Sequence, residues 1–174
     1  IHGVQPQEGT TGAHRVALVA HAPGRVDDQR EVEGVRRHYN TAYLADGNGE
    51  IVGTYDKTFL LAFGEYLPFG ETFPILYEWS PNSGHFTPGD HVRPLVLERD
   101  EGAPIRIATL ICYEDVLPGF TRKAVREGDP NLLVNITNDA WFGDTHEPWI
   151  HLALAKFRAV EHHRRGRGAG LGAT

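Results

Sequence analysis

Sulfur-containing residues, long apolar runs and an excess of positive charge are all scarce in this sequence. Its 174 residues include one cysteine, Cys112, and no methionine. A single cysteine excludes an internal disulfide, so the sequence does not indicate the redox compartment. No apolar run approaches the roughly 18 residues that span a bilayer. The formal net charge of -6 leaves no concentration of Lys and Arg for binding nucleic acid, so we expect one ordinary globular domain without a transmembrane segment or a nucleic-acid partner.

The two ends of the chain are unlike those of a complete domain. There is no start methionine, and residues 164–174 are basic and then rich in glycine. Such a composition buries too little apolar surface to order itself. We therefore expect a piece of a longer protein, with a partial domain over residues 1–165 and a disordered Gly/Arg-rich tail over residues 166–174.

Strand-like and helix-like segments alternate along the chain, which predicts an α/β domain. The apolar runs predict strands over residues 16–20, 39–45, 50–56, 93–99, 105–112 and 131–136. Helical patterning predicts helices over residues 121–127 and 148–162, the second with an inward-facing stripe of Ile150, Leu152, Leu154, Phe157 and Val160. Residues 26–37 are predicted to form a loop or a short exposed helix. Residues 59–79 are crowded with aromatics and interrupted by proline, which predicts a long irregular segment.

Cys112 lies where the predicted strand 105–112 ends, directly before Tyr113 and Glu114. A thiol at the carboxyl end of a buried strand is typical of the nucleophile of an α/β enzyme. The alternative is that a lone cysteine serves as a small buried hydrophobe. Because only the thiolate attacks, a catalytic cysteine needs a positive charge or a base nearby.

Two further groups of polar residues also lie where predicted strands end. Lys57 follows the strand 50–56, and Glu65 lies in an apolar stretch a few residues later. A buried carboxylate must find a partner, so the two are expected to pair, although Lys57 also fits a surface lysine at a strand end. Residues 135–143 leave another strand and include Trp141, a composition suited to a cleft or to a turn. Together these segments predict one shared site at one edge of the sheet.

These segments resemble known motifs when they are taken together. The motifs are YDK at 55–57, FGEYLP at 63–68, CYE at 112–114 and NDAWFG at 138–143, followed by the helix-like stretch 148–161. In combination they resemble the nitrilase (carbon-nitrogen hydrolase) superfamily, and within it the catalytic domain of the apolipoprotein N-acyltransferase family. The resemblance covers residues 39–165.

The resemblance implies a fold and a set of site residues. The fold would be an α-β-β-α sandwich, incomplete here at its N-terminal and C-terminal sides, with neither a cofactor nor a metal. The catalytic residues would be Cys112 as nucleophile, Lys57, and Glu65 as auxiliary glutamate. The substrate-binding residues would be Tyr113, Glu114 and Trp141. No residue of this chain matches the family's general-base glutamate, so we expect impaired catalysis.

The resemblance also implies an activity. A fatty acyl chain would pass from a phospholipid through a cysteine thioester to the N-terminal amine of an apolipoprotein, on the periplasmic side of a bacterial inner membrane. Two alternatives remain open: a soluble nitrilase-type amidase that hydrolyses a small C–N bond, and a non-catalytic remnant. Within residues 59–79, one amphipathic series is predicted either to face lipid or to pack as core: Phe69, Phe73, Ile75, Leu76, Tyr77 and Trp79.

Overall fold

Two β-sheets face one another and build the centre of the molecule. The computed structural model describes residues 17–20, 29–70, 72–80, 83–138 and 145–170. The first sheet is antiparallel, in the order β1-β4-β5, with strands Ala17–Ala20, Thr41–Ala45 and Ile51–Asp56. The second has the order β6-β7-β8-β9, with strands Leu95–Leu97, Ile105–Ile111, Leu132–Thr137 and Arg165–Gly170. In it, β6 runs antiparallel to β7, and β7, β8 and β9 run parallel.

The main hydrophobic core lies between the two sheets. Ala42 and Leu44 of β4 are fully buried, because alternate residues of this strand point toward the second sheet. From the second sheet, Ile107 and Ile111 of β7 join the same cluster, as do Val134 and Ile136 of β8. This shared core fixes the carboxyl end of β7 relative to the end of β5.

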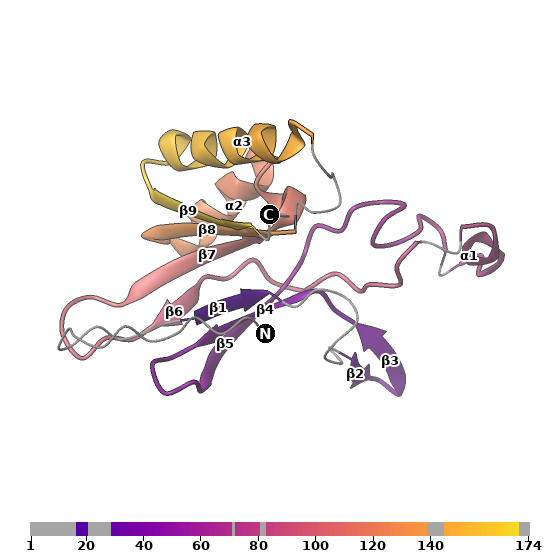
Figure 1. The fold of residues 1–174 in the computed structure, drawn as a ribbon. Helices are drawn as coiled ribbons and strands as arrows, with labels where there is room; N and C mark the ends of the chain where they lie inside the picture. The colour runs from indigo at the N-terminus through magenta and orange to yellow at the C-terminus, as the bar shows by residue number, and fades with distance from the viewer. Residues whose placement is uncertain (1–16, 21–28, 71, 81–82, 139–144, 171–174) are drawn as a thin grey trace.

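Two helices cover the outer face of the second sheet (Figure 1). They are α2, Pro118–Gly128, and α3, Glu147–Glu161. A second small cluster joins α2 to this face through Ala124, with Ala108 and Leu133 from the sheet. The described residues thus form one helical layer over two sheets, which confirms the predicted α/β class and the sandwich of facing sheets. The described helices do not include one long and apolar enough to cross a membrane.

Residues 29–38 correct one sequence prediction. The predicted loop or short helix is instead a hairpin of β2, Gln29–Val32, and β3, Val35–His38. The turn residues Glu33 and Gly34 both have positive φ, 53° and 79°, as tight hairpin turns require. Glu31 lies opposite Arg36, so the charged pattern that indicated an exposed loop instead includes an attractive cross-strand pair.

The buried face of α3 is a second correction. The predicted inward stripe is wrong, because Ile150, Phe157 and Val160 are exposed, as is Leu152. The buried positions are His151 and Arg158, with Leu154 and Ala155 partly buried between them. These four follow helical spacing equally well, but two are polar, so the apolar pattern marked the wrong side of the helix.

The chain end supplies a third correction. The disordered tail predicted from residue 166 is wrong as far as Gly170, because β9 pairs in parallel with β8 from Arg165 to Gly170. Pairing requires only backbone N–H and C=O groups, so a glycine-rich composition does not prevent it.

The aromatic arm, residues 59–70 and 72–80, extends away from the sheets and carries the short helix α1, Ile75–Trp79 (Figure 1). Apart from this helix, the segment is irregular, as predicted.

Candidate active site

Cys112 occupies a sharp turn at the carboxyl end of β7. The strand ends at Ile111, and the short 3₁₀ turn η1 spans Cys112–Glu114. Cys112 has φ of +53°, in the left-handed region that non-glycine residues rarely adopt. Such strain persists only where neighbouring structure holds it, and it is concentrated at functional sites. The thiol is partly buried and packs against the main core, at the strand end where the sequence placed it.

The surroundings of Cys112 act on its thiol in opposite directions. Burial raises the pKa of Cys112, whereas the positive charge of Lys57 lowers it. Hydrogen bonds with the Thr137 side chain and the Tyr113 backbone also lower this pKa, and the charge of Glu65 raises it. Lys57 is therefore the main group that favours the reactive thiolate.

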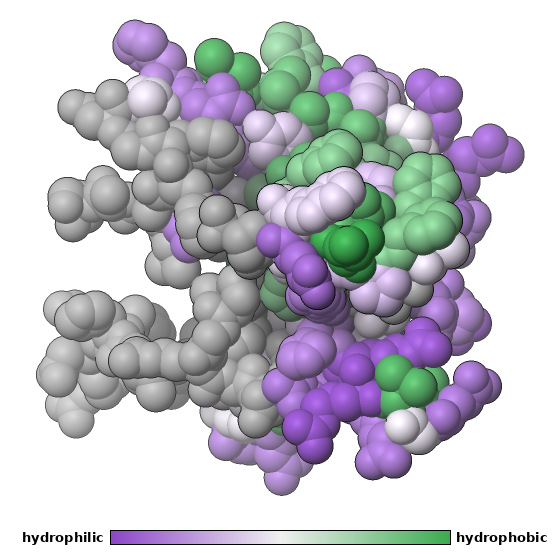
Figure 2. Space-filling model, turned by 90° about the vertical axis from the view of Figure 1, so that its right-hand side faces the viewer, coloured by the Kyte–Doolittle hydropathy of each residue, from purple (hydrophilic) through white to green (hydrophobic). Residues whose placement is uncertain are grey.

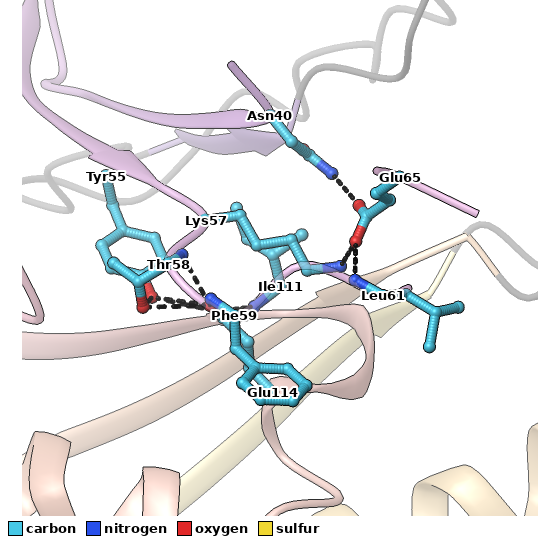
Figure 3. Close-up of polar contacts among 9 residues, drawn as sticks. All are labelled: Asn40, Tyr55, Lys57, Thr58, Phe59, Leu61, Glu65, Ile111 and Glu114. Carbon is cyan, nitrogen blue, oxygen red and sulfur yellow. Dashed lines mark hydrogen bonds and ion pairs between the residues drawn. The ribbon is translucent and has the colours of Figure 1, made fainter. Parts of the chain in front are cut away.

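Lys57 and Glu65 form the pair expected from the sequence (Figure 3). Lys57 Nζ donates to Glu65 Oε2 at 2.6 Å, and the lysine side chain is only 1% exposed. Two more donors hold the carboxylate: the backbone N–H of Leu61 at 2.8 Å and Asn40 Nδ2 at 3.0 Å. Since three donors orient Glu65, it can fix the direction of the buried ammonium without freely rotating.

Glu114 is fully buried and joins the segment that follows Lys57 to the segment that precedes Cys112 (Figure 3). Its Oε1 accepts the backbone N–H groups of Thr58 at 2.9 Å and Phe59 at 3.0 Å, immediately after Lys57. Its Oε2 accepts the N–H of Ile111 at 2.8 Å, immediately before Cys112. Burial raises the pKa of the Glu114 carboxyl, while these N–H donors lower it. One side chain thus ties the end of the first sheet to the end of the second.

This burial argues against the substrate contact predicted for Glu114. Both of its oxygens also accept from the Tyr55 hydroxyl, at 3.1 and 3.0 Å. The carboxylate is therefore surrounded by protein donors, and its place in the structure is that of a positioning group. Tyr113 is partly buried, and its hydroxyl donates to Glu147 Oε1 of α3 at 3.2 Å. Trp141 lies outside the described residues.

Other residues at the site were not predicted to act there. Asn40 holds Glu65 and directly precedes β4, as an ordinary strand-flanking residue can. Tyr55 holds Glu114; it lies within β5 and was noted only as part of the YDK motif. Asp115, Asn135 and His151 form a buried polar cluster behind Cys112. The one feature of the sequence that could have pointed to this cluster is an acidic residue, Asp115, three positions after Cys112. Among the described residues, the structure shows no group of three or more His, Cys, Asp or Glu arranged to hold a metal.

A cysteine, a buried lysine and a glutamate therefore lie together where the ends of the two facing sheets meet. The sequence profile of the carbon-nitrogen hydrolase family matches residues 4–164. The chain belongs to this family.

More narrowly, the chain is similar to apolipoprotein N-acyltransferases. It is 41% identical over 132 residues to that of Geobacter metallireducens, covering 75% of this chain and 24% of that protein. It is 42% identical over 124 residues to the apolipoprotein N-acyltransferase of Bdellovibrio bacteriovorus, covering 71% of this chain and 22% of that protein. The chain thus spans about a quarter of the length of these curated relatives.

A solved structure supports the fold independently. The crystal structure of a carbon-nitrogen hydrolase from Helicobacter pylori G27 superposes with a TM-score of 0.53 at 15% identity, covering 89% of this chain and 44% of that one. At this identity the likeness concerns the fold alone.

Proposed function

We propose that this chain is the catalytic part of an N-acyltransferase that moves a fatty acyl chain from a phospholipid to the N-terminal amine of an apolipoprotein. The observation that carries the proposal is the buried Lys57–Glu65 pair, whose lysine favours the Cys112 thiolate, in a chain 41% identical to an apolipoprotein N-acyltransferase. The roles of Cys112 as nucleophile, Lys57 as cationic stabiliser and Glu65 as orienting carboxylate belong to this proposal.

The proposed transfer has two halves. In the first, the Cys112 thiol gives up its proton to solvent and the thiolate attacks an ester carbonyl. A C–S bond forms, the ester C–O bond breaks, and the leaving lysophospholipid oxygen takes a proton back from solvent. In the second, the acceptor amine attacks the thioester, a C–N bond forms, the C–S bond breaks and the thiol regains a proton. The Lys57 ammonium and the Tyr113 N–H stabilise the oxyanion of each tetrahedral intermediate. Dividing one hard transfer into two easier steps is the benefit of covalent catalysis.

The aromatic arm supports a lipid substrate over a small amide. Phe69 and Trp79 are 76% and 75% exposed, and Phe73 and Ile75 are also exposed. Leu76 and Tyr77 are partly buried, with the Tyr77 ring stacked on His85 at 3.6 Å, so part of the series packs internally. Figure 2 looks onto this end of the molecule and shows hydrophobic residues gathered in one patch. A contiguous exposed apolar patch marks an interaction surface, which here we assign to the membrane on the periplasmic side of the bacterial inner membrane.

The test is direct detection of the acyl-enzyme. The chain is incubated with vesicles of a phospholipid labelled in its acyl chain, and a hydroxylamine-sensitive adduct is sought by mass spectrometry. Because Cys112 is the only cysteine, any thioester on the chain is located there. We expect the adduct on the wild type and its loss in Cys112→Ser. An intact thiol after long incubation, in protein whose Cys112 still reacts with iodoacetamide, would contradict the proposal.

The same preparation separates the competing functions. Release of ammonia from small amides without an adduct from phospholipid would favour a soluble amidase, and neither reaction would favour a non-catalytic remnant. No residue of this chain matches the general-base glutamate of the related enzymes, so we expect the adduct to form slowly. A rate equal to that of a longer version of the protein would contradict this impairment.

A further inference from the structure

A polar cluster is buried between the second sheet and its helices, behind the nucleophile turn. Asp115, at the end of η1, accepts from His151 Nε2 of α3 at 2.9 Å through one carboxylate oxygen. Its other oxygen accepts from Asn135 Nδ2 of β8 at 2.6 Å. Asp115, His151 and Asn135 are only 1%, 4% and 6% exposed. A buried carboxylate is costly unless it is hydrogen-bonded, so this cluster requires an explanation that packing alone does not give.

The chemistry assigned to Cys112, Lys57 and Glu65 does not use this cluster. The imidazole Nε2 faces Asp115, and because a carboxylate only accepts, that nitrogen carries a proton and donates. Among the residues that the structure describes, the buried oxygen Asn135 Oδ1 of the cluster has no hydrogen-bond partner. A fold optimised only for stability would favour apolar residues at these positions.

The position of the cluster explains it. Asp115 lies three residues after Cys112, and the intervening Tyr113 stacks its ring on His151 with centroids 5.7 Å apart. The hydroxyl of the same tyrosine donates to Glu147, one turn before His151 on α3. The first turns of α3 therefore hold the nucleophile turn at two points.

We propose that the Asp115–His151–Asn135 cluster is the positioning element that holds the nucleophile turn, so that Cys112 stays strained between Lys57 and the end of the sheet. Left-handed φ at a non-glycine residue is unfavourable and needs external support. Glu114 supports the turn from the side of the first sheet, and the cluster supports it from the helical side. Without the cluster the turn relaxes, which exposes the thiol and misaligns it with the oxyanion donors. This inference rests on the proposed function only where acyl transfer is measured.

The experiment compares two reactions of the same thiol. Alkylation by iodoacetamide at pH 8 reports how accessible Cys112 is, and acylation by the labelled phospholipid reports its alignment. His151→Phe keeps a ring against Tyr113 and removes the donor to Asp115, while Asp115→Asn places an amide opposite the Asn135 amide. The double variant Asp115→Asn with Asn135→Asp restores an amide–carboxylate hydrogen bond with the roles exchanged. The control, Arg158→Met, removes a buried polar side chain two turns further along α3, where Arg158 pairs with Glu161.

In both single variants we expect alkylation to rise about tenfold as the turn opens locally. Acylation should fall by about a hundredfold, the usual cost of a nucleophile displaced by an ångström. The double variant should return both rates toward the wild type, and Arg158→Met should leave their ratio unchanged. If the variants only destabilised the fold, Arg158→Met would change the alkylation and acylation rates in the same way as the two single variants.

Alkylation at the wild-type rate in both single variants, or the same rise in Arg158→Met, would overturn the proposal. If the expected alkylation pattern appears but wild-type protein forms no acyl adduct, the proposed function fails and the positioning role stands. If the wild type forms the adduct and the variants form it equally fast, the positioning role fails and the proposed function stands. Circular dichroism of each variant confirms that the compared proteins are folded.

Discussion

At the scale of single residues, the reactivity of Cys112 depends on a balance between burial and one positive charge. Burial alone makes the thiol a poor nucleophile at neutral pH, because its pKa is raised. Lys57 opposes this effect and Glu65 adds to it. The pair therefore sets both the direction of the ammonium and the ionisation of the thiol.

Substitutions in this pair should move the Cys112 pKa in opposite directions. In Lys57→Met the cation that favours the thiolate is lost, so the pKa rises further and alkylation below it slows roughly tenfold for each unit. In Glu65→Gln a negative charge is lost, so the pKa falls and alkylation becomes faster. The measurement is the rate of iodoacetamide labelling against pH.

Lys156→Met, which removes an exposed lysine on α3, is the matched control and should leave the profile in place. If the labelling rate against pH shifted in the same direction in Lys57→Met and Glu65→Gln, the opposite effects assigned to these two charges on the Cys112 pKa would be contradicted.

At the scale of structural elements, the aromatic arm is held in shape although much of it is exposed. Ser83 Oγ donates to the carbonyl of Phe63 at 3.0 Å, and the N–H of Gly84 donates to Gly64 at 2.8 Å. A segment that is already held in one conformation and has an apolar surface is suited to docking, because it loses little conformational entropy when it binds.

The arm variant Phe69→Ser with Trp79→Ser should weaken binding to phospholipid vesicles. Removing two exposed aromatic side chains forfeits the apolar area that would leave water at the membrane. We expect about a tenfold or larger loss of vesicle binding in a sedimentation assay, because burial of one such side chain contributes about 1.5–3 kcal/mol. Alkylation of Cys112 should not change.

Phe157→Ser on α3 is the control, because Phe157 is also an exposed aromatic but lies outside the arm. Equal losses of vesicle binding in the arm variant and this control would indicate nonspecific hydrophobic adsorption rather than a docking surface.

At the scale of the whole molecule, the site exists only where the two sheets meet. Lys57 follows β5 of the first sheet and Cys112 follows β7 of the second, so neither sheet holds both groups. The shared core aligns the sheets, and Glu114 joins their ends through backbone N–H groups on both sides.

Glu114→Gln should therefore destabilise the entire domain. The amide presents an N–H donor where the carboxylate accepted from backbone donors, so at least one buried N–H loses its partner. We expect a loss of about 1–3 kcal/mol in the free energy of unfolding, measured by urea denaturation. Glu78→Gln, at an exposed position of α1, should leave the midpoint unchanged. A midpoint equal to that of the wild type in Glu114→Gln would contradict this bridging role.

Local patterns predicted most of the elements correctly. The hairpin of β4 and β5, the strand before Cys112 and the helix α2 follow from alternation, turn residues and helical spacing within each segment. The pattern failed for the hairpin of β2 and β3, for the buried face of α3 and for β9. In each case charged, polar or glycine residues form a strand or the buried face of a helix because they pair or pack with another segment of the chain.

The sequence by itself determined the chemistry that is present: one thiol at a strand end, a lysine and a glutamate near another strand end, and the motifs that mark the family. Only the tertiary structure decided how they work together. It buried Lys57 against Glu65, turned Glu114 inward as a bridge between sheets, and supported the nucleophile turn through Asp115 and His151. The Glu114 contact between the sheets and the Asp115–His151 contact join residues that lie more than 30 positions apart in the chain, and a local pattern carries no information about such partners. Lys57 and Glu65 lie eight positions apart, so their pairing was expected from the sequence, and the structure added the burial of the pair.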